Sequence, residues 1–233
     1  MTKKPPSSFS GNRQLKQRVK TAKRRKISSV RWLARQINDP YVHLSKKEGY
    51  RSRAAYKILE LDDQFKFFKP GKVVIDLGAA PGGWTQVAVK RVKSTPENII
   101  VVGLDLLSIP AIEGSELLVM DFMDEKAPDA MRALTPGGAD IVLSDMAPNT
   151  TGHSVTDHLR IMGLLESAHE FACEVLKPGG VFIAKVFQGG TEQTLLADMK
   201  KRFTTVKHAK PKASRADSSE FYVVALGFRG DKA

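Results

Sequence analysis

Acidic side chains stand at the ends of several apolar, β-branched runs, where a parallel sheet would bring them together. The first run ends in Asp76, and the loop that follows it reads Leu77-Gly-Ala-Ala-Pro-Gly-Gly-Trp84. Its small residues let a ligand approach the backbone before a helix begins. The spacing G-x-x-x-G-G, with Pro81 removing one backbone donor, differs from the G-x-G-x-x-G of pyrophosphate-binding loops. The loop therefore favours a nucleoside cofactor without phosphate.

Two further aspartates extend this candidate cofactor site. Asp105 ends the second run, and its carboxylate can accept hydrogen bonds from both hydroxyls of a ribose. Asp121 follows the third run, where we expect it to meet an adenine amino group. Each aspartate alone could equally cap a loop or a turn, but their place at successive strand ends favours the cofactor interpretation.

A lysine inside an apolar run is a second candidate for chemistry. Lys185 lies in the run 181–186, where burying an ammonium group without a partner costs free energy. Its most accessible partner is an acid at the neighbouring strand end, and Asp145 meets that description. The pair is a candidate catalytic site, and a structural ion pair is the alternative.

The elements that must position these residues alternate along the chain. Strands are expected at 73–77, 99–104, 117–120, 141–143, 181–186, 205–208 and 221–228. The first five are continuous apolar runs, as expected of strands that are covered on both faces. Helical patterns lie at 52–67, with Ser52 as its N-cap, and at 83–92, 124–134, 157–176 and 191–203. The alternation predicts a doubly wound α/β fold, with a mostly parallel seven-stranded sheet and helices on both faces. Because the last two strands have little helical pattern between them, we expect one antiparallel strand.

The composition favours one large globular domain with a short appendage. The chain has 233 residues, of which 42% are hydrophobic and 27% charged, so a disordered or collagen-like chain is excluded. The single cysteine, Cys173, is expected in the core, and it excludes an internal disulfide and a zinc site of several thiolates. The histidines form no metal-ligand spacing. No apolar run has the length of a membrane span or signal peptide, so we expect a soluble, cytoplasmic protein without a metal.

Positive charge is concentrated at the N-terminus. Residues 1–57 hold 17 lysines and arginines against two acids, a net charge of +15, whereas residues 58–233 carry −3. Residues 1–30 contain ten basic side chains and no acid, which predicts a flexible basic arm, and residues 31–49 are expected to form a short helical lead-in. Such an arm suits RNA, DNA or a ribosome through counterion release. A solubilising tail, a transit peptide or a nuclear signal are the alternatives.

Four motifs follow one another in a distinctive order along the remaining chain. They are Ser52-Arg-Ala-Ala-Tyr-Lys57, Asp76-Leu-Gly-Ala-Ala-Pro-Gly-Gly-Trp84, Ser144-Asp-Met-Ala-Pro-Asn149 and Lys185-Val-Phe-Gln-Gly189. Together they resemble the FtsJ/RrmJ (RlmE) family of S-adenosylmethionine-dependent ribosomal RNA 2′-O-methyltransferases. The similarity runs from about Tyr50 to Phe228. The resemblance implies that residues 50–233 form a catalytic domain with the Rossmann-like methyltransferase fold.

The resemblance also implies the site residues. A catalytic tetrad would consist of Lys57, Asp145, Lys185 and Glu220. Contacts to S-adenosylmethionine would come from Gly82, Trp84, Asp105, Asp121 and Asp145. Without the family, Trp84 would be interpreted as a packing residue. Lys185 would accept or steer a 2′-hydroxyl proton, although two lysines and two acids do not by charge count alone yield a neutral lysine.

The implied reaction is 2′-O-methylation of a uridine ribose in 23S (large-subunit) ribosomal RNA, on the assembled large subunit, by a monomer. Transfer RNA or messenger RNA is the alternative substrate, because the same residues could serve any ribose. A non-catalytic RNA-binding ribosome-assembly factor is an alternative of another class, against which the intact tetrad argues. A nicotinamide oxidoreductase is disfavoured by the missing G-x-G-x-x-G.

Overall fold

The structure is a computed structural model that describes residues 17–148, 154–187 and 193–230. The motif positions Asn149, Gln188 and Gly189 lie outside the described residues. The chain divides into two compact units, Met1–Leu44 and Ser45–Ala233. The larger unit contains every residue predicted for the cofactor and catalytic sites.

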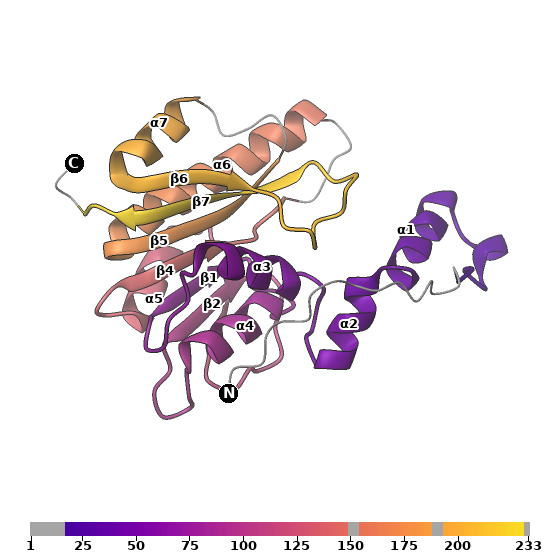
Figure 1. The fold of residues 1–233 in the computed structure, drawn as a ribbon, viewed down its shortest axis with the longest axis horizontal. Helices are drawn as coiled ribbons and strands as arrows, with labels where there is room; N and C mark the ends of the chain where they lie inside the picture. Colours follow the sequence, from indigo (N-terminus) through magenta and orange to yellow (C-terminus); the bar gives the residue numbers. More distant parts are fainter. Residues whose placement is uncertain (1–16, 149–153, 188–192, 231–233) are drawn as a thin grey trace. The chain divides into compact units, whose positions relative to one another are not determined.

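A seven-stranded sheet forms the centre of the larger unit (Figure 1). Its strands are β1 (Val74–Leu77), β2 (Val101–Asp105), β3 (Glu116–Val119), β4 (Ala139–Ser144), β5 (Leu176–Phe187), β6 (Phe203–Ala209) and β7 (Glu220–Phe228). They lie in the order β3-β2-β1-β4-β5-β7-β6. The first five strands are mutually parallel, and β7 runs antiparallel to both of its neighbours. This confirms the predicted mostly parallel sheet with one antiparallel strand.

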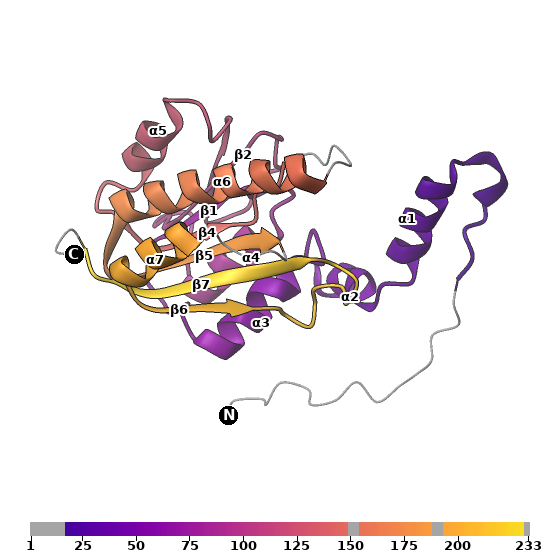
Figure 2. The ribbon, with the colours of Figure 1, turned by 90° about the horizontal axis from the view of Figure 1, so that it is seen from above.

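Helices cover both faces of the sheet, as predicted (Figures 1 and 2). One face carries α3 (Ala55–Phe65) and α4 (Gly83–Val92), and the other carries α5 (Ala127–Leu134), α6 (Ser154–Val175) and α7 (Gln193–Arg202). Successive side chains of a strand therefore enter two different apolar clusters, which explains why the central strands read as continuous apolar runs.

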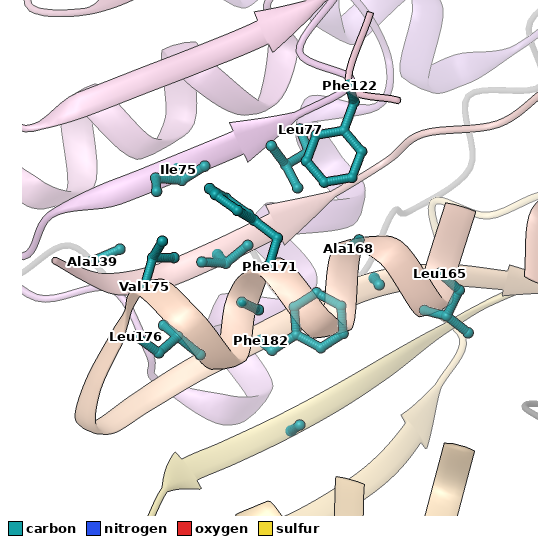
Figure 3. Packing of buried hydrophobic residues seen from close by; sticks show 14 of the residues in the cluster. Ile75, Leu77, Phe122, Ala139, Leu165, Ala168, Phe171, Val175, Leu176 and Phe182 are labelled. Atoms are coloured by element: carbon teal, nitrogen blue, oxygen red, sulfur yellow. The ribbon is translucent and has the colours of Figure 1, made fainter. Parts of the chain in front are cut away.

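Strand β1 illustrates this two-sided burial. Val74 belongs to the cluster beneath α3 and α4, whereas Ile75 and Leu77 belong to the cluster beneath α5, α6 and α7. Figure 3 shows the second cluster, in which Phe171 of α6 points toward the sheet. Its ring meets that of Phe122 edge-on at 5.7 Å between centroids, a favourable aromatic geometry.

Two local predictions are wrong. Strand β3 is not covered on both faces, because it lies at the edge of the sheet and Val119 is 60% exposed. Ser52 does not cap α3, which begins at Ala55 after Ala54 and has no side-chain cap. The Ser52 hydroxyl is instead buried with no hydrogen-bond partner among the described residues.

The smaller unit contains more regular structure than a flexible arm. A short 3₁₀ helix (Ala22–Arg24) precedes α1 (Ile27–Ile37), so helix begins inside the segment that was expected to be an arm. Next comes α2 (Pro40–Glu48), for which Pro40 is a favourable first residue and of which Pro40–Leu44 belong to this unit. The predicted arm residues 1–16 lie outside the described residues. Among the described helices, none is long and apolar enough to cross a membrane.

Candidate active site

A cavity of about 690 Å³ opens at the carboxyl ends of the parallel strands. It lies where the strand order reverses between β1 and β4, the usual ligand position in open α/β sheets. Its lining includes Asp105, Asp121, Asp145 and Lys185. The structure thus brings together four of the five polar residues that the sequence analysis placed at strand ends, and Asp76 is the one that does not line the cavity.

Asp105 is held across two loops of this cavity. One carboxylate oxygen accepts a hydrogen bond from the backbone of Ala80 at 2.8 Å, and the other accepts from the backbone of Leu107, also at 2.8 Å. A carboxylate offers about four acceptor positions, so the fixed group can still accept hydrogen bonds from a diol. Asp121 is oriented by a 2.9 Å bond from the backbone of Met123.

The cavity walls suit an uncharged base and a cationic ligand. Three apolar side chains of the lining are largely exposed, namely Leu106, Leu107 and Met123. They offer an apolar surface on which a flat base could pack. The charged groups of the lining are three carboxylates, one lysine and Arg160. At Gly78, where φ is +76°, a Cβ would lie 2.8 Å from the backbone nitrogen of Met146. The residues present therefore fit an adenosine carrying a positive charge.

Trp84 and Gly82 differ from the other predicted cofactor residues, because neither belongs to the lining of this cavity. The Trp84 side chain is 3% exposed, and its indole donates a 2.9 Å hydrogen bond to the carbonyl of Ala54. Its ring lies 5.6 Å from that of Tyr222. The Trp84 side chain therefore packs beneath the catalytic candidates. Gly82 precedes the first turn of α4 with φ of +104°.

The four tetrad residues form two adjacent ion pairs. Lys57, in the first turn of α3, lies with Nζ 2.6 Å from Oε1 of Glu220 on β7. Lys185 Nζ lies 3.2 Å from Oδ1 of Asp145 and donates a 2.6 Å hydrogen bond to the Asp145 carbonyl. All four side chains are mostly buried. The lysine predicted from its strand position thus has the predicted partner.

Tyr222 links the two ion pairs, and the sequence analysis did not identify it. Its hydroxyl lies 3.1 Å from Oδ1 of Asp145 and 3.0 Å from Oε1 of Glu220, so one phenolic hydrogen is shared between two carboxylates. Burial, with the two carboxylates adding to it, raises the pKa of Tyr222 well above its usual value. Strand alternation places Tyr222 on the same face of β7 as Glu220, because residues two apart share a face, but it does not give the cross-strand pairing of Tyr222 with Lys185.

Glu220 remains ionised despite its burial. Burial alone would raise the pKa of Glu220, but the Lys57 ammonium group, the charge of Lys185 and the hydrogen bond from Tyr222 outweigh it, and the net pKa is lowered. The hydroxyl of Ser214 lies 3.0 Å from the same Oε1 and completes its hydrogen bonding. A carboxylate with three such neighbours is a fixed negative charge beside Lys57.

Asp76 is a buried acid immediately behind the cavity. It is fully buried on β1, and one of its oxygens accepts a 2.7 Å hydrogen bond from the hydroxyl of Thr85 in α4. The other oxygen has no hydrogen-bond partner among the described residues. Burial raises the pKa of Asp76 to about 7, the Thr85 hydrogen bond opposes it, and the charges of Asp145 and Asp105 add to it.

Other titratable groups form no separate site. In the described part of the chain, no three histidine, cysteine, aspartate or glutamate side chains are placed to hold a metal ion. Cys173 is partly buried against the core, with Sγ 3.6 Å from Nε2 of His169.

Comparison with known proteins supports this interpretation. A protein of Paramagnetospirillum magneticum named ribosomal RNA large subunit methyltransferase E is 60% identical over 222 residues, 94% of this chain and 91% of the relative. A protein of the same name from Bradyrhizobium diazoefficiens is 59% identical over 212 residues, 91% of this chain and 93% of the relative. A crystal structure of a Plasmodium falciparum ribosomal RNA methyltransferase superposes with a TM-score of 0.68 at 30% identity, covering 78% of this chain and 100% of that one.

Fold, cavity and relatives define the class of the protein: it is a Rossmann-like methyltransferase that uses S-adenosylmethionine as its methyl donor. The model of the FtsJ-like methyltransferases matches residues 50–228. The chain belongs to the FtsJ-like methyltransferase family. The matched range agrees with the span over which the motifs predicted the resemblance.

Proposed function

We propose that this enzyme methylates the ribose 2′-oxygen of a uridine in large-subunit ribosomal RNA. The main support for this proposal is the contact of Lys185 with Asp145 in the lining of the cofactor cavity. A lysine at that place can accept or steer the proton of a substrate hydroxyl. The relatives named ribosomal RNA large subunit methyltransferase E support the choice of RNA. We propose further that the substrate is the assembled large subunit and that the enzyme acts as a cytoplasmic monomer.

S-adenosylmethionine would be held by the acids of the cavity. Asp105 would accept hydrogen bonds from the ribose hydroxyls, and Asp121 would meet the adenine amino group. Asp145 would face the positively charged end of the cofactor. Gly82 and Trp84 would act through the backbone at the start of α4, where the first N–H groups of a helix have no partner within it. When bound, the cofactor supplies an electrophilic methyl group.

Lys185 would accept or steer the proton that leaves the 2′-hydroxyl as the oxygen bonds to the methyl group and S-adenosylhomocysteine is released. In the structure its amine already donates to Asp145, so Asp145 orients it toward the cavity. The Lys57–Glu220 pair would lie beside this site and position it through the shared hydroxyl of Tyr222. Alignment of the two reacting atoms contributes the larger part of such a rate enhancement, and the base contributes a further factor.

A panel of RNA substrates tests this function. The protein is incubated with S-adenosylmethionine labelled in its methyl group and with large ribosomal subunits, bare ribosomal RNA, transfer RNA or messenger RNA. The RNA is then digested to nucleosides and analysed by mass spectrometry. We expect label in 2′-O-methyluridine from the large subunit. Label in transfer or messenger RNA alone would overturn the substrate, and cofactor binding without label in any RNA would favour an assembly factor.

A further inference from the structure

Helix α1 carries a tryptophan on its polar side. In α1 (Ile27–Ile37) the residues Val30, Leu33, Ala34 and Ile37 are half-buried and form one apolar stripe at helical spacing. Trp32 does not belong to that stripe and is 53% exposed. Its neighbours three and four positions away are all polar, namely Ser28, Ser29, Arg35 and Gln36. Packing within the described part of this unit therefore does not explain why a tryptophan stands at position 32.

The surroundings of Trp32 are strongly cationic. Residues 17–38 contain eight lysines and arginines, all exposed, and no acid. The basic residues are Arg18, Lys20, Lys23, Arg24, Arg25, Lys26, Arg31 and Arg35. None of the eight makes an ion pair with a described residue. A surface of this charge attracts a polyanion.

The two ends of this basic segment, residues 17–38, are joined by hydrogen bonds. The side-chain amide of Asn38 accepts a 2.8 Å hydrogen bond from the backbone N–H of Gln17 and donates a 3.0 Å bond to the Gln17 carbonyl. The same amide nitrogen donates to the carbonyl of Ala34 at 2.7 Å. The two ends of residues 17–38 are thus joined beside the last turn of α1. The cations are presented from a folded loop and helix, and the ordering cost of binding is correspondingly lower.

We propose that residues 17–38 form an RNA-binding element in which Trp32 stacks on an unpaired base while Arg31 and Arg35 contact the flanking phosphates. An exposed aromatic ring between arginines is the arrangement by which proteins hold single-stranded RNA. A membrane-surface helix would carry its tryptophan on the apolar side, and α1 carries it on the other. The inference rests on the proposed function only for the source of the RNA.

Binding of a single-stranded oligoadenylate of twelve nucleotides to the full chain tests the element. Stacking should quench the emission of Trp32, whereas Trp84 is buried and should not respond. We expect Trp32→Ala to weaken binding about tenfold with an unchanged salt dependence. Trp32→Phe should keep most of the affinity and lose the quenching. Arg35→Ala should instead lower the slope of log K against log salt by roughly 0.7.

The controls separate stacking from general effects. Val119→Ala removes another exposed apolar side chain, 60% exposed, from β3, outside the proposed element, and should leave affinity unchanged. Equal affinity of Trp32→Ala and the wild type, preference for a blunt RNA duplex, or binding of anionic vesicles in place of the oligonucleotide would each overturn the proposal. Methyl transfer to ribosomal RNA is measured in parallel, so that failure of the stacking and failure of the proposed substrate are distinguished.

Discussion

Tyr222 is the residue through which the two ion pairs of the site influence each other. Its hydroxyl is within hydrogen-bond distance of both Asp145 and Glu220, and its ring packs against Trp84. A single hydroxyl cannot donate fully to both acids, so the charge of each carboxylate affects the other. The protonation of the site is therefore a property of the whole cluster.

Replacing Tyr222 by phenylalanine should move the acid limb of the pH–rate profile. Loss of the hydroxyl removes a donor whose hydrogen bond helps to lower the pKa of Glu220, so the pKa of Glu220 should rise. A hydrogen bond to a charged group contributes about 1.5–3 kcal/mol, equivalent to roughly one pH unit or more. We expect kcat to fall at a pH about one unit higher than in the wild type. An acid limb that coincides with that of the control Tyr56→Phe, whose hydroxyl bonds Glu48, would contradict this.

Asp105→Ala should weaken binding of S-adenosylmethionine about tenfold or more, because an ionised acceptor for the ribose is lost. Calorimetry measures the dissociation constant, and Asp124→Ala, outside the cavity lining, is the control. Since Asp105 also holds two loops, S-adenosylhomocysteine is compared with its 2′-deoxy analogue. The wild type should discriminate between them and the variant should not. Equal discrimination by both proteins would refute the ribose contact.

At the scale of elements, strand ends were predictable and strand register was not. Apolar runs at regular intervals predicted the parallel strands, and their last residues indicated Asp105, Asp121 and Asp145 without any contact being known. The place of Tyr222 depends on the antiparallel register in which it pairs with Lys185, and periodicity contains no information on register. The closure of residues 17–38 by Asn38 is likewise a long-range contact that no local pattern encodes.

Asp76, which joins β1 to α4 by its hydrogen bond with Thr85, should make the stability of the fold depend on pH. The pKa of Asp76 is about 7 in the fold and about 4 in an unfolded chain. Between about pH 4 and about pH 7, the Asp76 carboxyl is therefore protonated in the folded protein and ionised in the unfolded chain. Stability from this group is then highest at low pH and falls as pH rises from about 4 to about 7. In Asp76→Asn the side-chain amide does not titrate, so the variant should not lose stability as the pH rises. The amide oxygen can still accept the hydrogen bond from Thr85.

Urea unfolding of Asp76→Asn and wild type at pH 5 and pH 8 tests this link. The stability of the variant relative to the wild type should increase by about 1–3 kcal/mol between the two pH values. The exposed Asp63→Asn serves as the control and should show no such change. A difference that is the same at both pH values would show that Asp76 is not held in its protonated form.

At the scale of the whole molecule, charge and chemistry are divided between the two units. Residues 1–44 hold 12 lysines and arginines against one acid, whereas residues 45–233 hold 25 against 24 acids and contain the cavity. Such a division suits an enzyme whose substrate is held by one part and modified by another.

Deleting residues 1–38 should therefore weaken binding to large-subunit ribosomal RNA and flatten its salt dependence, because the cations that displace counterions are lost. Affinity for S-adenosylmethionine should stay unchanged, since the cavity residues lie elsewhere in the sequence. Filter binding over a range of salt concentrations measures the slope. A slope equal to that of the full chain would show that the basic segment is dispensable.

Methyl transfer by Lys185→Ala is the most direct measurement of the central claim, that a lysine beside Asp145 acts on the ribose hydroxyl. With saturating S-adenosylmethionine and large ribosomal subunits, turnover should fall by about 10²- to 10⁴-fold while the cofactor dissociation constant stays unchanged. Lys177→Ala, a half-exposed lysine on the same strand, should retain turnover. Wild-type methyl transfer by Lys185→Ala would contradict the account.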